Sequence, residues 1–411
     1  MKKAGKKKTT KNKITAQQKP AETLQPIRRE KSTIIALALA AVVFIGALFC
    51  IYSQDILNGA GDIFTSSAEE QVEFEKATVT KIVNEDMAID EVEDGSYTGE
   101  QELAVIVKSG QYKNEEMVVY NYFGPLYGVP VEKGDSVVLT IKTHTDGEHS
   151  ATVYEFNRIP ILALFVLLFF AVIIIVGGRT GLKSLLGLVF TVICLFAILI
   201  PLLLKGAPTI LTTFIMCAYI AFVCFTILGG IHRKTMSAFL GTISGAFLAM
   251  VLGLAVQLIG KIDGLRLEDA EPLMQMKMYG LTIDIKGLLV AGIIISALGA
   301  VMDIAMSISS ALEEVHAANP SLSRNELFKS GMNIGRDMAG TMTNTLILAF
   351  LGSEFTLMIF LYSRGLTFYH LFSTAFVALE TISGISCSIG LILAIPLTAL
   401  ISATLIAGSE K

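Results

Sequence analysis

Long apolar runs alternate with short polar connections along most of the chain. After a first run near the amino terminus, seven more follow, at about 159–178, 183–204, 208–230, 237–260, 286–311, 338–361 and 387–408. A helix needs about 20 apolar residues to cross the roughly 30 Å of hydrocarbon in a bilayer. The pattern therefore predicts an all-α polytopic membrane helix bundle of about eight spans.

The segment 370–386 leaves the number of spans open. It is apolar, but it contains Glu380 and ends in Ser383-Gly384-Ile385-Ser386. Together with the run after it, the segment fits either two helices or an interfacial or re-entrant piece followed by one helix. We favour the second arrangement, which gives eight spans and a cytoplasmic carboxy terminus. Nine spans are the alternative.

Between the first and second apolar runs, residues 53–157 have the pattern of a small β-rich domain. Four segments are rich in β-branched residues and partly alternate between apolar and polar positions, and turn residues separate them. These segments are 102–108, 116–122, 136–143 and 151–156. The pattern predicts a small β-barrel or β-sandwich inserted before the bundle, with residues 53–72 as a linker.

Charge is distributed unevenly and predicts the orientation of the chain. Residues 1–31 hold eleven Lys or Arg and two Glu, whereas residues 53–158 hold seven basic and twenty-one acidic residues. Basic residues beside a first membrane helix keep that side in the cytoplasm. We therefore predict a basic cytoplasmic tail (1–31), an uncleaved anchor helix (32–52), an extracytoplasmic domain (53–157) and a multi-pass membrane domain (158–411).

The residues give no pattern typical of an enzyme, a cofactor site or a nucleic-acid-binding protein. The five cysteines all fall inside apolar runs, and no P-loop, GxSxG or HExxH motif is present. Basic patches interleaved with aromatic residues are also missing. We expect no enzymatic activity, no cofactor, no metal and no nucleic-acid partner. A cluster at His144, Asp146, Glu148 and His149 leaves metal binding as an alternative to an ordinary polar hairpin turn.

The run 286–311 carries the most informative polar residue. Gly292, Ser296, Gly299, Asp303, Ser307 and Ser310 recur at spacings of three and four, which places them on one stripe of a helix. An ionised Asp facing lipid costs several kcal/mol, so Asp303 should face protein or water. Asp303 is either an ion- or proton-handling residue or a structural carboxylate held by neighbouring hydroxyl groups.

A second polar group lies in the next apolar run, 338–361. Thr341, Thr343, Asn344 and Thr345 cluster near its predicted cytoplasmic start, and Asp303 lies about eight residues from the cytoplasmic end of its own run. At 1.5 Å per residue both groups are roughly 10 Å below the inner surface, so they can meet if the two helices are neighbours. They would then form either a site for a small cation or polar solute, or a hydrogen-bonded packing contact.

Two further acids and a glycine pair complete the candidates. Glu354 lies about 15 Å beyond Asn344 on the same helix, and Glu380 lies in the ambiguous segment. The three acids form either a relay or, as we favour, one buried acid and two interfacial ones. Gly241 and Gly245 form a GxxxG pair that predicts tight helix packing rather than a substrate site.

These motifs resemble the YibE/F family of bacterial multi-pass membrane proteins. The resemblance is carried by ALGAVMDIAMSI at 297–308, GMNIGRDMAGTMTNTLILAFLG at 331–352 and GGRTGL at 177–182. It covers nearly the whole chain and implies an anchor, an outer β-rich domain and a helix bundle in the bacterial cell membrane. Asp303, Arg336, Asp337 and Asn344 match positions of the family pattern. The resemblance implies no substrate.

Two hypotheses of function follow from the sequence. In the first, the chain is a permease for an ion or small polar solute, with Asp303, Ser307, Thr341, Asn344 and Glu354 along its path. An ion gradient or an ATPase on a separate chain would drive it, and a second membrane subunit is a possible partner. In the second, it is a non-transporting envelope scaffold whose outer β-domain binds a partner.

Overall fold

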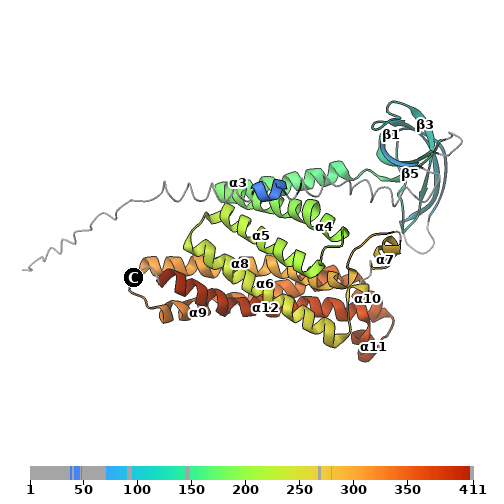
Figure 1. The fold of residues 1–411 in the computed structure, drawn as a ribbon. Coiled ribbons are helices and arrows are strands. Elements are labelled where there is room, and N and C mark those ends of the chain that lie inside the picture. Colours follow the sequence, from blue (N-terminus) through green and yellow to red (C-terminus); the bar gives the residue numbers. More distant parts are fainter. Residues whose placement is uncertain are drawn as a thin grey trace, which may run out of the picture.

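A computed structural model shows a small β-domain followed by a helical bundle (Figure 1). It describes residues 38, 41–46, 48, 71–89, 95–143, 149–266, 270–278 and 280–407. The predicted tail and most of the predicted anchor helix lie outside the described residues. The strands of the β-domain are β1 (Gln71–Ile89), β2 (Tyr97–Val107), β3 (Glu116–Phe123), β4 (Ser136–Thr143) and β5 (His149–Phe156).

The five strands close into a barrel in the order β1-β2-β3-β5-β4. The 19-residue β1 pairs with β4 along its first half and with β2 along its second, which closes the sheet. All pairings are antiparallel except that of β3 with β5. This connectivity is that of a five-stranded OB-type Greek-key barrel, which settles the choice between barrel and sandwich.

The core of the barrel follows from alternation in the strands. In β2, Leu103, Val105 and Val107 are fully buried, and Leu139 and Ile141 in β4 face the same interior.

The sequence predicted β2 to β5 but missed β1. Charged residues and two register shifts interrupt the alternation in β1, so its sequence does not read as a strand. The predicted linker overlaps the start of β1.

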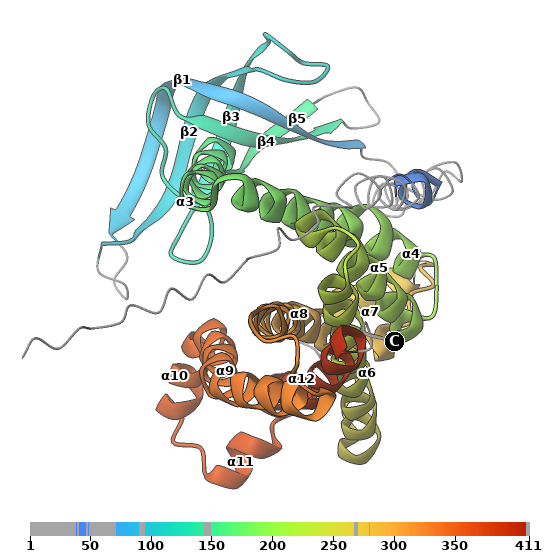
Figure 2. The ribbon, with the colours of Figure 1, turned by 90° about the vertical axis from the view of Figure 1, so that its left-hand side faces the viewer.

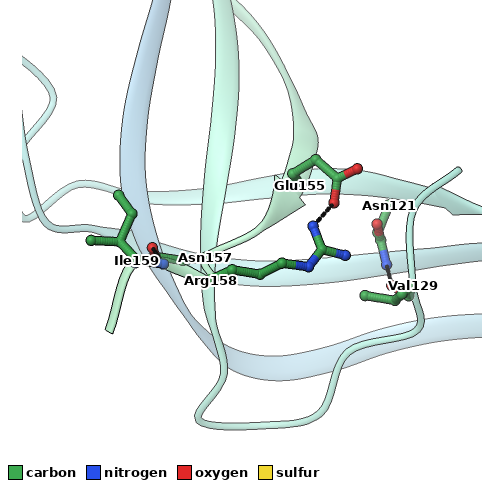
Figure 3. Close-up of polar contacts among 6 residues, drawn as sticks. All are labelled: Asn121, Val129, Glu155, Asn157, Arg158 and Ile159. Carbon is green, nitrogen blue, oxygen red and sulfur yellow. Dashed lines mark hydrogen bonds and ion pairs between the residues drawn. The ribbon is translucent and has the colours of Figure 1, made fainter. Parts of the chain in front are cut away.

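The junction between the two parts is short and held by side chains. Only two residues separate β5 from the first long helix, and the Asn157 amide donates to Ser136 Oγ at 2.9 Å. Asn157 Oδ1 also accepts from the backbone N–H of Ile159 at 3.2 Å, and Arg158 Nη1 lies 2.6 Å from Glu155 Oε2 (Figure 3). The barrel is therefore joined directly to the helix.

The bundle contains most of the remaining chain. Its helices are α3 (Ile159–Ile193), α4 (Ile200–Leu204), α5 (Thr209–Gly229), α6 (Arg233–Gly260), α7 (Ala270–Met278), α8 (Leu288–Ala318), α9 (Arg324–Ser353), α10 (Phe355–Ser363), α11 (Phe368–Ser373) and α12 (Ala375–Ala407), with a π-helical turn η1 (Cys194–Leu199) between α3 and α4 and short 3₁₀ turns η2 (Gly264–Arg266) and η3 (Ile285–Gly287).

Among the described residues, five helices are long and apolar enough to cross a membrane, or six if the bent pair α9–α10 is one span. These helices are consistent with a membrane protein. The expected number of about eight spans is not confirmed by them. The first of the five, Ile159–Leu204, has 46 residues and would be about 69 Å long if straight, which is more than twice the hydrocarbon thickness.

A glycine divides this first stretch. Gly178 has φ 53° and ψ −131°, a conformation that residues with a side chain rarely adopt, and a Cβ at Gly181 would collide with the carbonyl oxygen of Ile173. Eight residues of straight helix would separate these two positions by about 12 Å. The chain therefore turns back at Gly178 (Figure 1), and each half is long enough for its own crossing.

Two helix boundaries differ from the sequence prediction. Residues 324–336, which precede the predicted run 338–361, form the first turns of α9, because Ser323 and Glu326 make a capping box that starts the helix there. The predicted helix 338–361 is bent by 62° between α9 and α10, at Glu354. The ambiguous segment becomes the short α11 and the start of one long α12.

Tight contacts of small residues hold the bundle together, as the GxxxG pair predicted. A Cβ added at Gly245 would lie 2.7 Å from Ala394 Cβ in α12 and 2.7 Å from Val301 Cγ1 in α8, and one at Gly241 would collide with Thr398. The Ser309 and Ser402 hydroxyls, both buried, join α8 to α12 at 3.0 Å. Close backbone approach therefore fixes α6, α8 and α12 relative to one another.

Candidate functional site

The uncovered face of α8 is polar. Helices α5, α6, α9 and α12 pack around α8, and Figure 2 shows an open side between α9 and α3. From Leu288 to Glu313, the exposed residues of α8 are Gly292, Ser296, Gly299 and Asp303. This is the stripe that the spacing predicted, and Ser307, one turn after Asp303, is half-buried on it. The apolar residues of α8 are the ones that pack inside the bundle.

The adjoining helix α9 shows the same feature. From Asn333 to Thr345, every exposed residue is polar or glycine, namely Asn333, Arg336, Asp337, Gly340, Thr341, Asn344 and Thr345. Apolar residues of α9, such as Met338, pack against α8 and α12 instead. We call the exposed residues of α8 and α9 named here, together with Ser307, the polar face.

The contrast with α3 shows that this face does not suit lipid. In the first half of α3 the exposed residues are large and apolar, for example Leu164, Phe165 and Leu167, each more than 60% exposed. Such a surface is what a helix presents to hydrocarbon. The polar face presents a carboxylate, an amide and hydroxyl groups along helices that are long enough to cross a bilayer, so in a membrane water or another chain must cover it.

Packing between α8 and α9 fixes the relative heights of the polar residues. A Cβ at Gly335 would lie 3.2 Å from Ile308 Cδ1, and one at Gly331 would lie 3.0 Å from Leu312 Cδ1. These two pairs define an antiparallel register that, continued along the helices, places Asp303 level with Gly340, one residue before Thr341. The same register places Gly299 level with Asn344.

Asp303 lies at the middle of its helix. Because α8 continues to Ala318, Asp303 is the sixteenth of its 31 residues and lies about 23 Å from either end. The added end of α8 carries Glu313 and Glu314, so the depth of roughly 10 Å below the inner surface stays a prediction. In the part of the chain that the structure describes, the side chains of Asp303 and Asn344 make no hydrogen bond and no ion pair. The Thr341 hydroxyl donates to the Met338 carbonyl at 3.0 Å.

Glu354 lies elsewhere, in a pocket lined by α9 to α12. Helices α10 and α11 lie at the end of the bundle that also carries the β-domain (Figure 1). The bend between α9 and α10 turns this residue toward the start of α12, where Glu380 lines the same pocket of about 810 Å³. The structure thus brings Glu354 and Glu380 together and separates them from the polar face. Sequence reasoning missed this pairing, and its only signal was the polar Gly352-Ser353-Glu354 interruption of an apolar run.

Groups that could hold a metal are absent from the described residues, where no three or more His, Cys, Asp or Glu side chains converge. His149 bonds through Nδ1 with the Tyr112 hydroxyl and the Thr143 hydroxyl, each at 3.1 Å. The other members of the suggested cluster, His144, Asp146 and Glu148, lie outside the described residues.

The comparison with protein families decides the classification. The sequence model of the YibE/F-like protein family matches residues 165–408, which is more than half of the chain. The chain belongs to the YibE/F-like family. No curated protein and no solved structure matches it. The YibE/F-like match contains the polar face and the pocket, and it begins after the β-domain, so the resemblance extends over less of the chain than the motifs implied.

Proposed function

We propose that this YibE/F-like protein is a permease for a small cation or a polar solute, and that its path follows the polar face of α8 and α9. The observation that carries the proposal is the exposure of Asp303. It lies halfway along a helix that is longer than the bilayer is thick, and no described residue pairs with it.

The physical argument rests on the cost of a carboxylate in hydrocarbon. Translocon-based scales place an Asp at the centre of a membrane helix at about 2.5–3.5 kcal/mol, and neighbouring polar groups would add to this cost. A path filled with water or solute removes the cost, because it solvates Asp303 and the hydroxyl and amide groups beside it. The stripe of glycine and serine on α8 also leaves room beside the helix, since a Cβ at Gly292 or Gly299 would meet nothing within 4 Å.

Each residue then has a role that suits its chemistry. Asp303 supplies the negative charge that binds a cation or carries a proton. Ser307, Thr341 and Asn344 supply neutral oxygen ligands at similar or adjoining depth. Glu354, which the sequence placed nearer the exit, lies in the separate pocket with Glu380 and is not assigned to this path. An ion gradient, or an ATPase on a separate chain, supplies the driving force, and a second membrane subunit closes the open side of the path.

The sidedness of the proposal comes from charge. The basic tail places the amino terminus in the cytoplasm and the acidic β-domain outside, in a bacterial cell membrane. The Lys234–Glu313 ion pair, at 3.3 Å, then lies at the cytoplasmic end of α6 and α8. The negative charge of the outer domain would raise the local concentration of cations near the entrance.

Flux through the reconstituted protein tests the proposal. Purified wild-type protein, Asp303→Asn and Glu314→Gln are placed in liposomes, and uptake of monovalent and divalent cations, protons and small polar solutes is measured. Asp303→Asn keeps the size of the side chain and removes the charge, so uptake should fall to the level of empty liposomes. Glu314→Gln makes the same chemical change at an exposed acid near the end of α8, outside the polar face, and is the matched control, with uptake expected to persist.

Two results would contradict the proposal. The first is unchanged uptake in Asp303→Asn. The second is a folded wild-type protein that moves none of these solutes, with or without a gradient.

The second candidate, an envelope scaffold, draws support from the barrel surface. Tyr120 and Tyr122 are exposed and stacked on β3, and Phe74 packs edge-on against exposed Tyr154. Exposed aromatic side chains often mark a protein-binding surface. Replacing Tyr120 and Tyr122 by Ser should then abolish recovery of a stoichiometric partner and the cellular role, whereas the permease hypothesis predicts that flux is retained.

A further inference from the structure

The pocket that contains Glu354 and Glu380 has the properties of a binding site. It is bounded by the end of α9, by α10 and α11, and by the first turns of α12. Its volume of about 810 Å³ is within the roughly 300–1,000 Å³ that is usual for pockets that hold drug-sized molecules. The pocket does not overlap with Asp303 or with the exposed residues of α8.

The lining is apolar apart from two acids. Aliphatic side chains form most of the wall, and Phe350, Phe372 and Tyr362 add aromatic surface. The polar groups are two carboxylates, Glu354 and Glu380, and two hydroxyls, Thr381 and Tyr362. The lining contains no Lys, Arg or His.

Two nearby acids without a basic partner, in an apolar wall, are unfavourable unless a positive charge compensates them. Among the described residues, neither glutamate makes a side-chain hydrogen bond or an ion pair. The nearest cation along the chain, Arg364, lies over the Phe360 ring at 5.6 Å instead of joining an acid. Among the described residues no side chain supplies the counter-charge, so a cationic ligand would find an uncompensated negative site here.

We infer that this pocket binds an organic cation with an apolar body. The carboxylates would neutralise its charge, the aromatic rings would add cation–π attraction, and the aliphatic wall would bury its body. A small hydrated metal ion fits poorly, because the wall offers it few oxygen ligands. This inference rests on the pocket alone and stands or falls separately from permeation through the polar face.

The test measures binding and not flux. The full-length protein in nanodiscs of zwitterionic lipid is equilibrated with labelled tetraphenylphosphonium, and the amount bound to empty nanodiscs is subtracted. Tetraphenylborate has the same shape and the opposite charge, so it controls for non-specific partition into apolar space. The protein should bind tetraphenylphosphonium saturably and should not bind tetraphenylborate.

Variants then locate the site. Glu354→Gln and Glu380→Gln should each weaken binding of tetraphenylphosphonium by at least about tenfold, which corresponds to about 1.4 kcal/mol. Thr381→Trp should also weaken it, because the larger side chain occupies part of the pocket one residue after Glu380 while both charges are kept. Glu314→Gln changes an exposed glutamate at the far end of α8 and should leave binding unchanged.

The inference is overturned by equal binding of the two probes, by the absence of saturable binding, or by binding that survives all three pocket variants. The comparison of the two probes on the wild-type protein decides the matter even if a variant fails to fold.

Discussion

A single methyl group at Gly245 should destabilise the bundle, although alanine is a better helix former than glycine. The added carbon would lie 2.7 Å from both Ala394 Cβ and Val301 Cγ1, and both neighbours are fully buried. Carbon atoms prefer a separation of about 3.5–4.0 Å, so α6 must move away from α8 and α12 by about 1 Å. Such overpacking costs about 1–3 kcal/mol.

Gly292→Ala is the matched control. It makes the same chemical change on a neighbouring helix, at a position where nothing lies within 4 Å of the new Cβ. It should be neutral or stabilising by up to about 1 kcal/mol, because only the helix propensity changes. At about 2–4 °C per kcal/mol, Gly245→Ala should unfold about 2–12 °C below Gly292→Ala.

The buried cysteines provide the assay. Cys194, Cys217, Cys224 and Cys387 are buried, so a thiol-reactive fluorophore reports unfolding of the detergent-solubilised protein as they become accessible. The reasoning is refuted if the two glycine variants unfold at the same temperature, because Gly245 would then have no special packing role.

Two further changes test the barrel and the start of α9. Gln101→Leu leaves the Asn121 amide and the backbone N–H of Val131 without their shared acceptor, the Gln101 side-chain oxygen. The free energy of unfolding of the barrel should fall by about 1–3 kcal/mol, and tryptic cleavage at Lys133 in the intact protein should become faster. An unchanged cleavage rate would argue against this network. Ser323→Ala removes the capping box, which should cost about 1 kcal/mol of helix stability. Amide hydrogen exchange should become faster in the first turn of α9 and stay unchanged in the β-domain. Equal exchange in the variant and the wild-type protein would contradict the capping role.

Features that depend on local periodicity could be predicted from the sequence. The stripe on α8 was visible because an apolar helix that carries Gly, Ser and Asp at spacings of three and four must segregate them to one side. The strands β2 to β5 alternate regularly, and the packing role of Gly241 and Gly245 follows from their small size. Each of these signals lies within a single segment of about twenty residues or fewer.

Features that depend on distant contacts could not be predicted. Charged residues interrupt the alternation in β1, and its pairing with both β2 and β4 is what makes it a strand. The pairing of Glu354 with Glu380 requires the 62° bend between α9 and α10, for which the sequence gives no angle. The end of α8 differed from the prediction because the helix continues beyond its apolar run into a polar segment, which hydropathy excludes from the span.

The central claim is that water reaches the polar face beside Asp303. The direct measurement is labelling of Ser307→Cys with a membrane-impermeant methanethiosulfonate reagent, in a variant whose own cysteines are replaced, with the fully buried Ile304→Cys as the control. The account predicts that the cysteine at position 307 reacts in the folded, membrane-embedded protein and that the one at position 304 does not. If the cysteine at position 307 stays as unreactive as the control when the reagent is applied from either side, the polar face is dry and the proposed path does not exist.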